Sequence, residues 1–92
     1  MQKRILIVDD EPAIREMVAF ALRKGDYEPV HAGDAQQAQS AIADKVPDLI
    51  LLDWEVPDIS GLDVLHWIRT NMGYSVPVMF ITSRTDESDL VV

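Results

Sequence analysis

Short apolar runs alternate with amphipathic stretches along the whole 92-residue chain. The runs over residues 5–8, 48–53 and 78–81 are too short for helices and are typical of buried parallel strands. A weaker strand is predicted at about residues 27–31. No linker, low-complexity run or repeat interrupts the alternation. The pattern predicts one α/β domain whose parallel strands are connected by helices.

The first amphipathic stretch predicts a helix over residues 12–24. Pro12 suits the first turn of a helix, and the apolar residues that follow recur with helical spacing. Gly25 is expected to end this helix in the left-handed conformation.

Two further helices and one loop complete the pattern. Asp34 and Gln37 have the spacing of a capping box and predict the start of a second helix. A third helix is predicted over about residues 62–72, where apolar residues form one stripe. Residues 54–61 are rich in turn-forming types and are expected to form a loop without regular structure.

Carboxylates stand at the ends of two of the apolar runs. Asp9 and Asp10 follow the first run, Asp53 ends the third predicted strand, and Thr82 follows the last one. Parallel strands joined by helices bring their carboxyl ends to the same edge of a sheet, so we expect these residues around one crevice. Open α/β sheets bind ligands at that edge. Acids that end strands are often only solvated, but their joint placement favours a functional site.

Converging carboxylates repel one another unless a hard cation with oxygen ligands neutralises them. Mg²⁺ is the natural candidate, because it binds through one or two carboxylates and completes its shell with water and phosphate oxygens. Asp53 could then act as a nucleophile, as carboxylates do in aspartyl-phosphate chemistry. The hydroxyl of Thr82 could donate a hydrogen bond to the transferred phosphoryl group.

Composition limits the classes of partner. The chain holds eight basic and sixteen acidic residues, for a formal charge of −8, which argues against a nucleic-acid surface and for a cation or basic partner. It has no cysteine, and no apolar stretch approaches the length of a signal peptide or a membrane span. We therefore expect a soluble, cytoplasmic protein.

The motifs together resemble a known family. They are Ile5-Leu6-Ile7-Val8-Asp9-Asp10-Glu11, Ile14-Arg15-Glu16-Met17, Pro47-Asp48-Leu49-Ile50-Leu51-Leu52-Asp53-Trp54 with Pro57 and Ser60-Gly61, and Pro77-Val78-Met79-Phe80-Ile81-Thr82-Ser83-Arg84. This set resembles the receiver domain of two-component response regulators, in particular transcriptional regulators of the phosphate-response type, which carry a DNA-binding output domain. The resemblance implies a flavodoxin-like fold with strand order 2-1-3-4-5.

The resemblance also implies a role for each site residue. Asp53 would accept a phosphoryl group from a histidine kinase. Mg²⁺ would bind to Asp10, Asp53 and the backbone carbonyl of Glu55, with Asp9 supporting it through water. Thr82 would contact the phosphoryl group and report its presence.

The family pattern continues beyond the residues present here. It includes a fifth strand that ends in a Lys-Pro pair and a final helix, so we expect residues 1–92 to form a receiver domain that is incomplete at its C-terminus. Without a fifth strand, the strand over residues 78–81 would present a bare apolar edge. The sequence thus predicts self-association through that edge.

Two other functions stay open at this point. Magnesium phosphohydrolases of the haloacid-dehalogenase type also place a nucleophilic aspartate after an apolar strand, but they use a second aspartate two residues later, where this chain has Glu55. In the other alternative the chain is an interaction module that is not phosphorylated at all.

Overall fold

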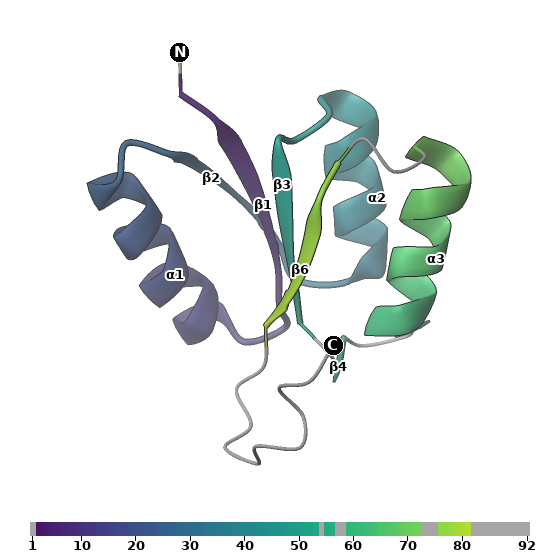
Figure 1. Ribbon diagram of the computed structural model, residues 1–92. Helices are drawn as coiled ribbons and strands as arrows, with labels where there is room; N and C mark the ends of the chain where they lie inside the picture. Colours follow the sequence, from purple (N-terminus) through teal and green to yellow (C-terminus); the bar gives the residue numbers. More distant parts are fainter. Residues whose placement is uncertain (1, 54, 57–58, 73–75, 82–92) are drawn as a thin grey trace.

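The computed structural model describes residues 2–53, 55–56, 59–72 and 76–81. Its main sheet is parallel, and the strands lie in the order β2-β1-β3-β6. These strands are β1 (Arg4–Val8), β2 (Glu28–Ala32), β3 (Leu49–Asp53) and β6 (Val78–Ile81). Helix α1 (Pro12–Lys24) covers one face, and α2 (Ala35–Asp44) and α3 (Gly61–Met72) cover the other (Figure 1). The predicted flavodoxin-like α/β architecture is confirmed.

The two central strands are buried on both faces. Leu6 and Val8 of β1 point into the core beneath α2 and α3, and both are at most 1% exposed. Their neighbours Ile5 and Ile7 are also buried and, because side chains alternate along a strand, they face α1. Continuous aliphatic runs are what such two-sided burial requires.

Helices α2 and α3 close the larger core. Val64 and Ile68 lie one turn apart on α3 and are almost fully buried, and Ala38 and Ile42 do the same on α2. These residues belong to the same core cluster as Leu6 and Val8 of β1 and thus hold both helices on the sheet.

The end of α1 corrects one expectation. The helix spans the predicted residues, but Gly25 has a φ of −88° and is not left-handed; Asp26 is, with a φ of 67°. The N–H of Asp26 donates to the carbonyl of Arg23 and that of Tyr27 to the carbonyl of Leu22, which is the hydrogen-bond pattern of a Schellman motif. Aspartate tolerates this conformation better than most residues do.

The same cap explains where β2 begins. The N–H of Tyr27 closes the helix end, so the strand starts at Glu28, one residue later than predicted. The capping box at α2 forms in altered shape. Asp34 accepts from the N–H of Gln37 at 2.8 Å, but the Gln37 side chain accepts from Gly33 and not from Asp34.

The expectation of an irregular loop over residues 54–61 is wrong. Two short antiparallel strands lie there, β4 (Glu55–Val56) and β5 (Ile59–Ser60), with Val56 paired to Ile59. Both residues of that pair are β-branched and favour extended backbone. Turn-forming residues dominate this segment, but two residues separate β4 from β5 in the sequence, which is also the spacing of a hairpin.

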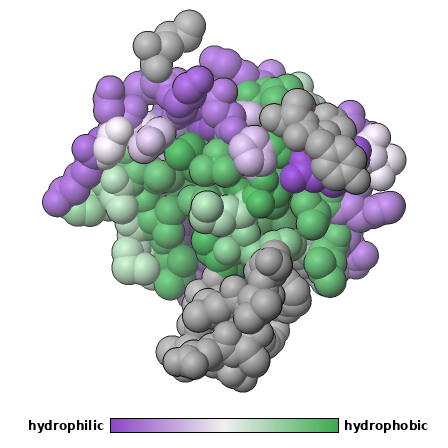
Figure 2. All heavy atoms as spheres, viewed as in Figure 1, coloured by the Kyte–Doolittle hydropathy of each residue, from purple (hydrophilic) through white to green (hydrophobic). Residues whose placement is uncertain are grey.

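Apolar side chains gather in a broad area over the middle of the molecule in the view of Figure 2. On β6, Met79 is 56% exposed, and Phe20 on α1 is exposed to a similar degree.

In the described part of the chain, no helix has the length and hydropathy needed to cross a membrane.

The core predicts a stability difference along α3. Ile68→Ala should lower the free energy of unfolding by about 2–5 kcal/mol, because it leaves a cavity in a packed core. Leu62→Ala on the same helix is the control; Leu62 is exposed, so the change should be within about 0.5 kcal/mol. Urea unfolding followed by circular dichroism measures both. Equal effects of the two substitutions would contradict this packing of α3.

Candidate functional site

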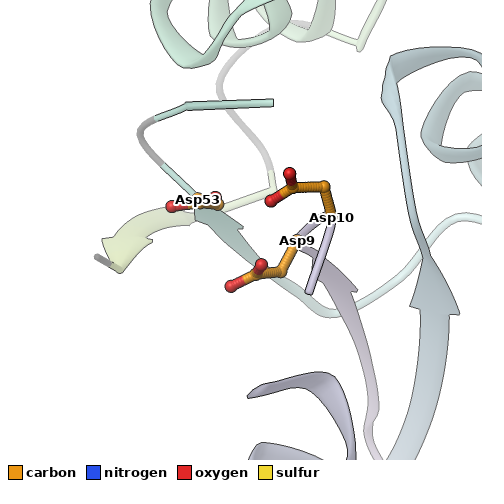
Figure 3. A group of neighbouring side chains, drawn as sticks. All are labelled: Asp9, Asp10 and Asp53. Atoms are coloured by element: carbon orange, nitrogen blue, oxygen red, sulfur yellow. The ribbon is translucent and has the colours of Figure 1, made fainter. Parts of the chain in front are cut away.

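Three aspartates meet at the carboxyl edge of the sheet. Asp9 and Asp10 follow β1, and Asp53 is the last residue of β3. The two strands are parallel neighbours with Val8 opposite Leu52, so the next residues, Asp9 and Asp53, lie at the same level of the sheet edge. One carboxylate oxygen from each of the three residues lies within 4.8 Å of those of the other two. Figure 3 shows the three side chains next to one another at the ends of their strands. The predicted convergence of these acids is thus present in the fold.

The three acids differ in burial. Asp9 is 2% exposed and Asp53 is 7% exposed, whereas Asp10 is exposed to solvent. The cluster therefore has a buried floor and an open side. A ligand could approach from the side of Asp10.

Asp9 is held through its backbone and its side chain. Its N–H donates to the carbonyl of Ala32 at the end of β2, at 3.1 Å. Its Oδ1 accepts from the N–H of Glu11 at 2.9 Å, and its carbonyl accepts from Nη1 of Arg15. These bonds fix the turn between β1 and α1, and with it the place of Asp10.

Burial raises the pKa of Asp9, and the nearby charge of Asp10 raises it further. The N–H of Glu11 and the charge of Arg15 act in the opposite direction without cancelling the rise. A raised pKa means that the folded chain holds this proton more tightly than the unfolded chain does. Stability is therefore lost as the pH rises through the folded pKa, and a cation beside the ionised group would offset that loss.

The donor set fits a hard divalent cation. Three carboxylates offer oxygen atoms close enough together to share one ion, and Asp10 is exposed to solvent. Mg²⁺ favours such a site, because it binds few carboxylates and keeps several waters.

Of the other two predicted site residues, Glu55 is among the described residues and Thr82 is not. Glu55 begins β4, two residues after Asp53. Thr82 lies outside the described residues, but Ile81, which precedes it, is the register partner of Asp53.

Two residues beside the acids had no predicted role. Arg15 reaches back from the first turns of α1 to Asp9, and Gly33 lies against the Arg15 guanidinium. Arg15 follows Glu11 by one helical turn, so helical spacing could have indicated that Arg15 lies near the acids. The contact with Gly33 joins residues that are far apart in the sequence, so no local pattern indicates it.

Comparison with known proteins agrees with this geometry. The chain is 44% identical over 92 residues to the phosphate regulon transcriptional regulatory protein PhoB of Escherichia coli, covering 99% of this chain and 40% of that protein. It is 39% identical to the DNA-binding response regulator MtrA of Mycolicibacterium smegmatis, again with 40% of that protein covered. The chain thus spans about two fifths of the length of these relatives.

Solved structures show the same fold. The response regulator TrrA of Thermotoga maritima, in complex with Mg²⁺-BeF, is 38% identical; the TM-score is 0.84, with 97% of this chain and 77% of that chain covered. The chemotaxis response regulator CheY4 of Vibrio cholerae is 27% identical with a TM-score of 0.86, and 97% of this chain and 75% of that chain are covered. The protein-family model described as "Response regulator receiver domain" matches residues 5–92 of this chain. The chain therefore belongs to the receiver domain family of two-component response regulators.

Proposed function

We propose that this receiver domain accepts a phosphoryl group on Asp53 in a magnesium-dependent reaction. The observation that carries the proposal is the acidic cluster, in which the buried Asp53 lies at the end of β3 with its carboxylate close to those of Asp9 and Asp10. A nucleophile, a cation site and an open side for the donor would thus lie together.

In the proposed reaction an oxygen of Asp53 attacks the phosphorus of a phosphohistidine on the kinase. The P–N bond breaks as the O–P bond forms, and the imidazole leaves with its electron pair and takes up a proton. The backbone of β3 is paired on both sides, with β1 and β6, and this pairing would hold Asp53 in place for the attack. Little reorganisation is then needed for the transfer.

We assign the cation to Asp10, Asp53 and the backbone carbonyl of Glu55, with Asp9 acting through water. When bound, Mg²⁺ would neutralise charge on the phosphoryl oxygens. Asp9 suits the indirect role, because one of its oxygens already accepts from Glu11. We assign to Thr82 the hydrogen bond to the phosphoryl group, and its position in the sequence, directly after the register partner of Asp53, supports this role.

The proposed partners follow from the family and from the relatives. A histidine kinase would supply the phosphoryl group, and a DNA-binding output domain outside this chain would carry the response, since relatives are named as DNA-binding or transcriptional regulators. The receiver itself, with its charge of −8, would not bind nucleic acid directly. These proposed partners support a cytoplasmic location for the protein.

We further propose that the domain turns over no external substrate. The phosphohydrolase alternative would need an aspartate where Glu55 stands, and the family assignment supports the receiver instead. The same assay that tests phosphorylation also separates these alternatives.

Incubation with Mg²⁺ and acetyl phosphate should add one phosphoryl group, seen by intact mass. Asp53→Asn should abolish the addition, because an amide cannot form the acyl phosphate. Asp44→Asn is the matched control, since Asp44 is exposed at the far end of α2 and should leave the addition unchanged. Multiple turnover of phosphate esters would support the phosphohydrolase alternative instead. If the chain is neither phosphorylated nor active on esters, the interaction-module alternative would be supported.

Mg²⁺ alone should stabilise the domain at neutral pH. At a concentration 100-fold above Kd, the free energy of unfolding should rise by about 2.7 kcal/mol. Asp10→Asn should remove most of this gain, whereas Asp44→Asn should keep it. Chemical unfolding with and without Mg²⁺ measures the difference, and an equal gain in both variants would rule out the assigned cation site.

We also propose self-association through β6. Among the described residues this strand pairs only with β3, and its Met79 is exposed. Met79→Lys should convert dimers to monomers, because a charged residue on a strand edge opposes pairing with another chain. Val46→Lys, at an exposed apolar position away from β6, is the control. Sedimentation velocity measures the change; a wild-type monomer at every concentration would exclude this association.

A further inference from the structure

We infer that Arg15 is a positioning residue of the acidic cluster, which fixes the turn that carries Asp9 and Asp10 and thereby tightens the binding of a divalent cation. This inference rests on the proposed cation site. Arg15 would act through the backbone of Asp9, without touching the cation or the phosphoryl group.

The contact that carries the inference joins a helix to a strand end. Nη1 of Arg15 donates to the carbonyl of Asp9, the peptide group that links Asp9 to Asp10. On its other side Asp9 donates its N–H to the carbonyl of Ala32. The chain at the end of β1 is thus held from α1 and from β2 at once, immediately before Asp10.

The surroundings of the guanidinium leave it little freedom. A Cβ atom on Gly33 would lie 3.2 Å from Nη1 of Arg15 and 3.3 Å from Oε1 of Gln37. The Gln37 oxygen is itself held by the N–H of Gly33 at 2.7 Å. Because glycine has no side chain, position 33 leaves room for the guanidinium of Arg15. Gln37, at the start of α2, borders the same space.

The contact between Arg15 and Asp9 is unfavourable in two respects that a contact serving only the stability of the fold would not require. In the described part of the chain, the buried Nε of Arg15 has no hydrogen-bond partner, which is unfavourable. A fixed positive charge beside the acids also opposes a second cation there. A residue that only neutralised the acids could do so from the surface, as a salt bridge with both partners solvated.

The two possible roles of Arg15 predict opposite effects of its removal on Mg²⁺ affinity. If Arg15 acts only as a charge, its removal should strengthen Mg²⁺ binding, because a repulsion disappears. If it positions the turn, its removal should weaken binding despite that lost repulsion. Removing a group that orients a ligand typically costs about 10-fold or more in metal affinity.

The experiment uses Arg15→Met, which removes donor and charge, and Gly33→Ala, which keeps the charge but crowds Nη1. Arg23→Met is the matched control; it makes the same change of charge near the other end of α1, where Arg23 is exposed. Calorimetry at one ionic strength measures Mg²⁺ affinity. Hydrogen exchange of the Glu11 amide, followed by NMR without metal, measures the turn directly, because this N–H bonds to Asp9.

We expect both Arg15→Met and Gly33→Ala to weaken Mg²⁺ binding and to speed exchange at Glu11, with Arg23→Met unchanged in exchange. Tighter binding by Arg15→Met with unaltered exchange would overturn the inference, and so would wild-type values in both variants. If Arg15→Met does not fold, Gly33→Ala decides alone by the same two readouts. A wild-type chain that binds no Mg²⁺ would refute the proposed function, while exchange at Glu11 would still decide whether Arg15 holds the turn.

Discussion

The parallel pairing of β1 with β3 is the constraint on which the rest of the structure depends. Their register sets Val8 opposite Leu52, so the next residues, Asp9 and Asp53, lie at the same level at the edge of the sheet. Aliphatic side chains on both faces stabilise this pairing, because both faces of the two strands are buried. The acids are thus brought together by the burial of their apolar neighbours, against their own repulsion.

That repulsion is contained by local hydrogen bonds. Asp9 is nearly fully buried, yet its N–H, its carbonyl and its Oδ1 each have a partner. Buried polar groups with partners cost far less than bare ones, so the fold tolerates a buried acid whose pKa is raised. Asp10, by contrast, is exposed to solvent.

Periodic features could be predicted from the sequence, and contacts between distant residues could not. The strands, the three helices and the meeting of Asp9, Asp10 and Asp53 follow from apolar spacing and the rule for parallel crossovers. The left-handed residue was assigned to Gly25 by residue type, but the position of the last helical bonds selects Asp26. The hairpin of β4 and β5 was hidden because its few residues carry both turn and strand signals.

Arg15 shows why the remaining part of the site needs three dimensions. Its neighbours come from β1 and from the start of α2, which only the folded sheet brings together. If its charge repels a cation while its hydrogen bond orders the acids, the two effects partly cancel in affinity but not in geometry. The cluster would then bind Mg²⁺ with moderate strength in a defined arrangement. Such a combination would suit the proposed phosphoryl transfer, for which the position of the cation matters more than the tightness of its binding.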